Sequence, residues 1–409
     1  MMTRTPLIPA LALLALAIAP PDRLPAQRPD SVGAQSVGTQ ESSTGGQSSA
    51  VWENSGRQRY GIFAGCGRTP LSSGQPSGSL DPTASTNGPM TQNRNDLLLG
   101  NPFGIEVRGD RYWITTIDDH CVYHGQLDHP MISRVAGTGQ QGYSGDDGPA
   151  LDATFNWPHE VRSDPAGNLY IADTRNHVIR RIDSESGIIT TIAGDGTEGF
   201  AGDGESGDRV RFRQPHSVVL DDAGGLIVAD TVNHRLRRID LTSGIVQTIA
   251  GNGQKQLPTD GAKASESPLF GPRSLAVDDK SIWVALREGN SIWRIDRATG
   301  AIHHVAGTGK KGYSGDGGSP KTATFSGPKG LDIDDRGRLL VVDTENHAVR
   351  RIDLRTDQIE TVLGGKAAKT TTPLKRPHGI RVLDGAKFLV ADSEQHRVVA
   401  SNDAANADR

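Results

Sequence analysis

The chain has 409 residues and a net charge of −4, and glycine accounts for 50 of its residues. Hydrophobic residues make up 35% and charged residues 22%, which excludes a bundle of membrane-spanning helices. A mildly acidic chain has no electrostatic basis for binding a nucleic-acid backbone. Two cysteines are too few for a disulfide scaffold or a four-thiolate zinc site.

Residues 1–26 have the pattern of a secretory signal peptide. The apolar stretch 7–19 (LIPALALLALAIA) follows Arg4 and is too short to span a bilayer. We predict cleavage after Ala26, because Pro20 disfavours cleavage after Ala19. Residues 27–59 are rich in Ser, Gly and Gln, and we interpret them as a disordered linker. The pattern predicts export to the periplasm or the extracellular space, with no membrane span.

Residues 60–409 contain one motif six times. The copies that start at Trp157, Gln214 and Gly327 agree most closely, and looser copies start at Asn101, Gly271 and Arg376. Each copy opens with a proline, and these are Pro102, Pro158, Pro215, Pro272, Pro328 and Pro377. Their successive spacings are 56, 57, 57, 56 and 49 residues. Self-similarity at a fixed period is typical of a repeat architecture.

The second copy contains four short β-branched or apolar segments separated by turn residues. They lie at 160–163, 169–172, 178–182 and 188–193. Four antiparallel strands per repeat are typical of a propeller blade, and no helical periodicity supports an α-solenoid. The sequence therefore predicts an all-β fold, a six-bladed β-propeller of four-stranded antiparallel blades.

The sixth copy ends before its fourth strand. The missing strand has a counterpart near the N-terminus, where 60–67 (YGIFAGCG) resembles 189–196 (ITTIAGDG). An N-terminal strand that completes the last blade would close the ring and remove two open sheet edges. We therefore predict that residues 60–64 close blade six.

The repeats resemble those of the NHL-repeat propellers. The resemblance rests on 172–177 (ADTRNH), 229–234 (ADTVNH) and 342–347 (VDTENH), together with the Pro-x-x-apolar openings. The segments between copies at 142–146 and 312–316 are similar to the NHL region of teneurins and of exported bacterial homologues. The resemblance covers nearly all of 60–409 and implies the fold. It does not imply one function, because this fold hosts scaffolds, ligand binders and a few lyases.

Several repeating residues have a simple structural interpretation. In four copies an aspartate follows the second strand, namely Asp173, Asp230, Asp343 and Asp392, and we expect it to fix the turn by bonding the backbone two residues on. We expect the Asn-His pairs after it to serve turns and packing. The consecutive arginines at 180–181 and 237–238 lie on opposite strand faces, and we expect them to pair with carboxylates of adjacent blades.

The acidic glycine loops raise the question of calcium. The loops at 145–148, 202–204 and 315–317 each offer one or two carboxylates, whereas calcium takes six to eight oxygens. None has the twelve-residue calcium-loop spacing. We favour a turn and capping role, with calcium as the lesser alternative.

The residue after the opening proline differs between copies. In order it is Phe103, His159, His216, Arg273, Lys329 and His378. Since the first strand of a propeller blade lines the central channel, these side chains should ring one mouth of it. Three histidines are a possible zinc set with an open fourth position. With Arg273 and Lys329 they could instead form a cationic cup for an anionic ligand, and a purely structural lining is the third interpretation.

The Pro-His openings also resemble those of the peptidyl-hydroxyglycine amidating lyases, whose zinc is held by three histidines in this context. His159, His216 and His378 match that position, but they come from blades two, three and six rather than from alternating blades. The loops between strands two and three offer no tyrosine in the place of the catalytic one. Glu160, next to His159, is a candidate partner of a metal ligand or a general base.

No nucleophile elbow, phosphate loop, Cys-x-x-Cys or His-Glu-x-x-His motif occurs in the chain. We therefore predict a non-catalytic module that binds a protein, a glycan or a small anionic ligand at the channel mouth. The alternative is a metal-dependent lyase or lactonase-like hydrolase that uses the three histidines. Cofactor, ligand and oligomeric state stay open.

We also expect a disulfide between Cys66 and Cys121. Cys66 follows the closing strand of blade six, and Cys121 begins the third strand of blade one, the next blade around the ring. Strand four ends and strand three begins on the same face of a propeller, and export permits oxidation. Two separate buried thiols are the alternative.

Overall fold

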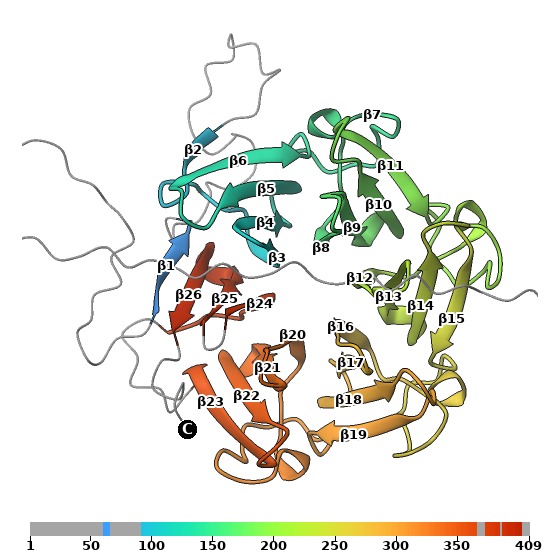
Figure 1. The fold of residues 1–409 in the computed structure, drawn as a ribbon, viewed down its shortest axis with the longest axis vertical. Helices are drawn as coiled ribbons and strands as arrows, with labels where there is room; N and C mark the ends of the chain where they lie inside the picture. Colours follow the sequence, from blue (N-terminus) through green and yellow to red (C-terminus); the bar gives the residue numbers. More distant parts are fainter. Residues whose placement is uncertain (1–59, 66–90, 366–372, 385–386, 403–409) are drawn as a thin grey trace, which may run out of the picture. The chain divides into compact units, whose positions relative to one another are not determined.

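The structure, a computed structural model, describes residues 60–65, 91–365, 373–384 and 387–402. The described residues form six antiparallel sheets around a common axis, and Figure 1 shows the ring they make. They contain no α-helix, and their short 3-10 turns lie between strands. No helix in these ranges has the length and apolar character to cross a membrane. The prediction of an all-β six-bladed propeller is confirmed.

Each blade consists of four consecutive antiparallel strands, except that blade six takes one from the N-terminus. Blades one to three contain β3 (Pro102–Arg108), β4 (Arg111–Thr116), β5 (Cys121–Gln126) and β6 (Met131–Ala136); β8 (Pro158–Ser163), β9 (Leu169–Asp173), β10 (Val178–Ile182) and β11 (Ile188–Ala193); and β12 (Pro215–Leu220), β13 (Gly225–Asp230), β14 (Arg235–Asp240) and β15 (Val246–Ala250).

Blades four to six repeat this order. They contain β16 (Pro272–Val277), β17 (Ser281–Leu286), β18 (Ser291–Asp296) and β19 (Ile302–Ala306); β20 (Pro328–Ile333), β21 (Arg338–Asp343), β22 (Ala348–Asp353) and β23 (Gln358–Gly364); and β24 (Ile380–Asp384), β25 (Lys387–Asp392), β26 (Arg397–Asn402) and β1 (Tyr60–Ala64).

The 3-10 turns fall into two groups by position. Those between strands two and three are η2 (Thr174–Asn176), η4 (Thr231–Asn233), η7 (Thr344–Asn346) and η8 (Ser393–Gln395). Those in the segments that connect blades are η1 (Ala150–Asp152), η3 (Gly207–Arg209), η5 (Ala264–Glu266) and η6 (Pro320–Thr322).

The predicted closure of blade six is confirmed. β1 pairs antiparallel with β26, with Gly61 opposite Ala400 and Ile62 opposite Val399. Phe63 is buried against Tyr112 of blade one, and the two rings meet edge to face with centroids 4.9 Å apart. The N-terminal strand thus seals the join between the last blade and the first.

Two blades have a fifth strand that the repeat pattern does not predict. β2 (Thr91–Asn93) pairs antiparallel with β6, and β7 (Gly148–Pro149) pairs with β11. Each of these short strands pairs with the outermost strand of its blade, whose edge backbone groups would otherwise lack partners. These residues belong to connecting segments, which carry no strand-length apolar pattern.

The core consists of layers between blades. Six clusters of buried apolar side chains fill the spaces between successive blades, one cluster per space. Strand two of a blade touches both layers, and every residue of β13 and β21 is therefore buried. A lone blade could not bury both faces, which explains why the repeats must stack around an axis.

A hydrogen bond joins each blade to the next. The residue that follows the turn between strands two and three has a left-handed backbone, with φ of 60° at His177, and its Nδ1 accepts the Gln214 N–H of the next blade at 3.1 Å. The acceptor–donor pairs at the other interfaces are His120–Trp157, His234–Gly271, Asn290–Gly327, His347–Arg376 and His396–Asn101. The Asn-His pairs thus do more than the predicted turn and packing role.

The repeated aspartate holds its blade together differently from the prediction. Asp173 accepts the N–H of Asn156, ahead of strand one, at 2.8 Å, rather than that of the residue two positions on. Its other oxygen accepts the Asn176 amide at 2.8 Å and lies 3.5 Å from the guanidinium of Arg180. The carboxylate therefore links strands one, two and three.

The buried arginines pair with carboxylates, as predicted, but not with those of adjacent blades. Arg180 has no exposed surface and contacts Asp173 of its own blade and Asp146 of the segment leading into it, the latter at 2.8 Å. Arg237 and Arg350 pair with Asp203 and Asp316 in the same way. The carboxylates of the acidic glycine loops thus balance arginines, which favours the structural interpretation over calcium.

Candidate functional site: the channel mouth

The six variable residues after the opening prolines meet at one end of the channel. Five of them are the second residue of a first strand, and His378 lies two residues before β24, so the repeat places all of them at the same end of the channel. Together with Glu160 and Gly379 they line one cavity of about 20 Å³. The residues that line it are Phe103, His159, His216, Arg273, Lys329 and His378. A single water needs about 10–15 Å³, so this cavity has room for one water-sized group.

Aromatic packing closes most of this mouth. The Phe103 ring stacks on the imidazole of His378 with centroids 3.8 Å apart, and its other contact is edge to face with His159 at 4.5 Å. His159 in turn meets His216 edge to face at 4.5 Å. All four side chains are buried, so aromatic rings plug most of the mouth.

The tautomer of His378 follows from its hydrogen bonds. Its Nε2 lies 3.2 Å from the Lys329 ammonium, which only donates, so Nε2 is the acceptor. Its Nδ1–H then donates to the Ser393 hydroxyl at 2.8 Å, and that hydroxyl donates to the Pro102 carbonyl at 2.6 Å. Both nitrogens of His378 are engaged.

The three-histidine zinc site does not fit this arrangement. The phenyl ring of Phe103 lies between His159 and His378, and His378 has no nitrogen free for a metal. Among the described residues, no three His, Cys, Asp or Glu side chains are grouped so that they could hold a metal ion. The buried Nδ1 of His216, which has no hydrogen-bond partner among the residues that the structure describes, would favour an additional group here. We therefore derive no metal chemistry from this site.

Two cations form the wall opposite the aromatic plug. Lys329 is buried, and its ammonium lies 3.2 Å from a Glu345 oxygen as well as from His378. Arg273 is partly buried, and its guanidinium has no hydrogen bond or ion pair with any residue that the structure describes. A guanidinium that is neither paired nor fully solvated is an uncommon feature of a folded chain.

Burial and nearby positive charges shift the pKa values of these groups. Burial, and then the charge of Arg273, lowers the pKa of Lys329 to about 7, although Glu345 opposes the shift. Burial, and then Arg287, lowers the pKa of Arg273 to about 9. Burial, and then these cations, holds the pKa of His159 and His378 well below the ordinary value. Near neutral pH the mouth therefore carries a positive charge on Arg273, a partial one on Lys329, and neutral imidazoles at His159 and His378.

The contacts of Glu160 do not support the predicted role of metal-ligand partner or general base. Its carboxylate forms an ion pair with Arg162, which crosses to it from the same strand. Burial raises the pKa of Glu160, and the charge of Arg162 opposes this rise. No hydrogen bond joins Glu160 to His159 within the described residues.

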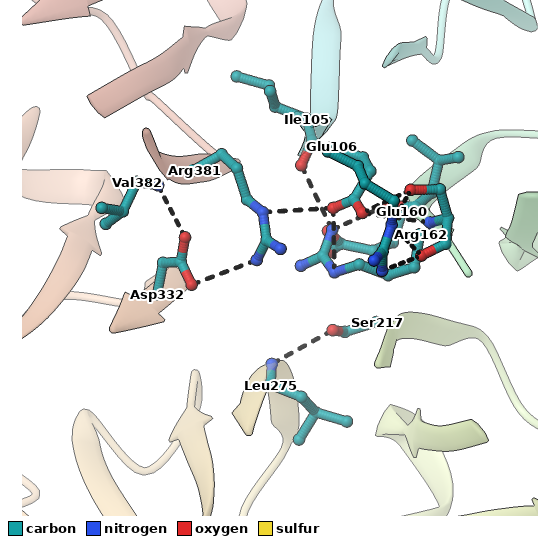
Figure 2. A network of polar contacts seen from close by, with 12 residues as sticks. Ile105, Glu106, Glu160, Arg162, Ser217, Leu275, Asp332, Arg381 and Val382 are labelled. Atoms are coloured by element: carbon teal, nitrogen blue, oxygen red, sulfur yellow. Dashed lines mark hydrogen bonds and ion pairs between the residues drawn. The ribbon is translucent and has the colours of Figure 1, made fainter. Parts of the chain in front are cut away.

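A belt of alternating charges lies one layer below the mouth. Arg381 bridges Glu106 at 3.2 Å and Asp332 at 3.3 Å, and Arg162 lies 3.9 Å from Glu106, as Figure 2 shows. Asp332 also accepts the Val382 N–H at 2.7 Å. The belt ties the first strands of blades five, six, one and two together beneath the cavity.

Sequence reasoning missed this belt, although a signal for it was present. The four side chains stand three residues after the ring residue of their copy, and their charges alternate around the ring in the order Asp332, Arg381, Glu106, Arg162. Blades three and four have Val219 and Ala276 at this offset. The charged arc therefore lies on one side of the channel only.

The predicted disulfide stays a prediction, because Cys66 lies outside the described residues. Cys121 is buried, and its Sγ lies 3.7 Å from the Gly137 carbonyl oxygen. Burial raises the pKa of the Cys121 thiol above the range in which a thiolate would form near neutral pH.

The fold and the ring define the class of protein: a six-bladed β-propeller with a plugged channel mouth. The NHL repeat family matches residues 155–182, 212–239 and 325–352, in blades two, three and five. The chain is a six-bladed propeller that contains NHL repeats in three of its blades. It matches the Arabidopsis thaliana protein SUPPRESSOR OF QUENCHING 1, chloroplastic, with 27% identity over 285 residues, 66% of this chain and 26% of that protein.

Two further curated relatives share the repeats. NHL repeat-containing protein 2 of Gallus gallus is 29% identical over 51% of this chain and 32% of its own length. Teneurin-1 of Gallus gallus is 30% identical over 54% of this chain and 9% of its own length, which confirms the resemblance to teneurins. The chain thus spans a third or less of each of these relatives.

Solved structures support the fold. A protein of unknown function from Bacteroides thetaiotaomicron has a TM-score of 0.59 with 14% identity, over 84% of this chain and 75% of that one. An auxiliary nutrient binding protein from the same organism has a TM-score of 0.58 with 13% identity, over 84% and 76%. At this identity the likeness concerns the propeller fold alone.

Proposed function

We propose that the protein is an exported, non-catalytic binding module whose channel mouth takes the anionic group of its ligand. The observation that carries the proposal is the unpaired guanidinium of Arg273 beside the ammonium of Lys329. An anion would offset the positive charge of Arg273, which after burial is the main cause of the lowered pKa of Lys329. The unpaired Nδ1 of His216 offers a third contact in the same cavity.

The dimensions of the mouth limit what enters. A cavity of about 20 Å³ has room for one oxygen of a carboxylate, and the remainder of the ligand would lie on the outer face. The ligand is therefore a small carboxylate, or a protein or glycan partner that presents one acidic group. Export is supported by the signal-like pattern of residues 1–26, and its test is the N-terminal mass of the protein recovered from the periplasm or medium.

Titration calorimetry with acetate tests the binding proposal, with uncharged acetamide as the matched ligand control. We expect acetate to bind and acetamide not to bind. Arg273→Gln should lower the acetate affinity at least tenfold, and Lys329→Met should lower it by a similar factor. Arg355→Gln removes an exposed arginine from the turn between β22 and β23 and should have no effect. Equal affinity in the wild type and in Arg273→Gln would refute the proposal.

A further inference from the structure

A second cavity lies away from the channel mouth, in the groove between blades four and five. Its volume is about 590 Å³, within the range of roughly 300–1,000 Å³ that is usual for small-molecule sites. Blade four contributes Trp283 of β17, Arg294 of β18 and His303 and His304 of β19, and blade five contributes Asp357 and Leu354. It also reaches the turn at 278–280, at the end of β16 opposite the mouth.

Blade four departs from the repeat where it lines this cavity. The β18–β19 pairing sets Trp293 opposite His304 and Arg294 opposite His303. The same pairings in blades two and five set a buried arginine opposite a threonine, Arg180 with Thr191 and Arg350 with Thr361.

Those threonines are covered by an aromatic residue of the incoming loop. The hydroxyl of Tyr143 bonds Thr191 at 3.0 Å, and that of Tyr313 bonds Thr361 at 2.9 Å. Blade four keeps the loop aspartate, since Asp260 accepts the backbone N–H of His304 at 3.0 Å as Asp203 accepts that of Thr248 in blade three. Blade four differs at Leu257, three residues before Asp260, where the loops of blades two and five have Tyr143 and Tyr313, so no tyrosine hydroxyl bonds the outer strand here.

The lining combines fixed walls with both signs of charge. The Trp283 indole N–H donates to Asp278 at 2.9 Å, and the ring of Trp293 packs at 4.9 Å from that of His304, which fixes two aromatic groups. Leu354 is 39% exposed and forms an apolar rim on the facing blade. The carboxylates and cations in the lining nearly balance, so the cavity favours an uncharged ligand.

Histidine, arginine and carboxylate side chains at one site supply both donors and acceptors. A neutral ligand that bonds to both the donors and the acceptors needs several hydroxyl groups. A ligand that also packs on aromatic and aliphatic side chains needs apolar faces, and a sugar ring has both features. We propose that the groove between blades four and five is a binding site for a neutral mono- or disaccharide. This proposal is independent of the anion site at the mouth.

Saturation-transfer NMR and titration calorimetry with glucose, N-acetylglucosamine, maltose and cellobiose test the proposal. We expect at least one of these sugars to bind, and we expect His303→Ala to lower its affinity at least tenfold. His303 is partly exposed, with an ion-pair distance of 3.4 Å to Asp260, so its removal should leave the fold intact. Thr190→Ala changes the register-equivalent residue of blade two and should leave sugar binding unchanged.

Arg273→Gln should also leave sugar binding unchanged, which separates this site from the mouth. Asp357→Asn provides a second variant in case His303→Ala does not fold, and it should weaken the same sugar. The proposal is overturned if none of the four sugars binds or if binding survives both groove variants. It is also overturned if the groove binds free glycine, a charged zwitterion, and none of the neutral sugars.

Discussion

His177 of blade two accepts the backbone N–H of Gln214 in blade three through Nδ1, at 3.1 Å. An equivalent bond closes each of the other interfaces, and in blade four the acceptor is the side-chain oxygen of Asn290, 2.9 Å from the Gly327 nitrogen. The left-handed backbone at these positions, φ 60° at His177 and 43° at Asn290, aims the side chain across the interface. The ring is therefore held by side-chain acceptors in addition to apolar layers.

We expect His177→Ala to destabilise the protein by about 1–3 kcal/mol, because the Gln214 N–H then loses its acceptor. His177→Asn should recover most of this loss, since asparagine tolerates the left-handed backbone and blade four already uses it. Chemical denaturation of the three proteins measures the difference. Equal stabilities of the alanine and asparagine variants would show that the bond contributes nothing.

His177 also makes the stability of the folded chain depend on pH, in a direction that its pKa shift fixes. Burial lowers the pKa of His177 in the folded chain, so below about pH 6.5 the unfolded chain binds the proton more readily and stability falls. Burial raises the pKa of Asp173 and Asp230 to about 7, which acts in the opposite direction.

The comparison with His177→Asn isolates the histidine from these aspartates. We expect the wild type to lose stability relative to this variant below pH 6.5, by up to about 1.4 kcal/mol per pH unit. Between pH 7 and 8 the two stability curves should run parallel. Parallel curves down to pH 5 would contradict the assigned acceptor role.

Arg180 and Arg181 provide a matched pair of variants. Arg180→Met should cost about 3–5 kcal/mol, because it leaves the buried carboxylate of Asp173 without its cation. Arg181 is partly exposed and pairs with the half-exposed Asp183 at 2.8 Å, so Arg181→Met should cost less than about 1 kcal/mol. Thermal unfolding distinguishes them, and a larger loss for Arg181 would reverse the assignment.

Ring closure by β1 predicts a sharp difference between two truncations. Removal of residues 1–56 should leave the melting temperature unchanged, because β1 begins at Tyr60. Removal of residues 1–66 deletes β1, exposes the edge of β26 and uncovers Tyr112 at the interface with blade one. We expect aggregation or a large drop in melting temperature, and equal melting temperatures would contradict the closure.

The repeat spacing was sufficient to predict the blades, the closure and the identity of the six ring residues. Strand boundaries at 178–182 and 188–193 match β10 and β11, because turn residues bracket them closely. The packing within the ring was not predictable, since it depends on rotamers: the Phe103 ring separates His378 from His159. Spacing also says nothing about a cavity such as the one beside His303, because side chains from strands of blade four and from a turn of blade five line it together.

The most direct test of the account is a crystal structure of the protein grown or soaked with acetate. We predict a carboxylate whose oxygen contacts both the Arg273 guanidinium and the Lys329 ammonium, and no such density in crystals of Arg273→Gln grown in the same solution. A wild-type mouth that holds only water at saturating acetate, or a carboxylate bound elsewhere with Arg273 still unpaired, would contradict the assignment of the channel mouth as an anion-binding site.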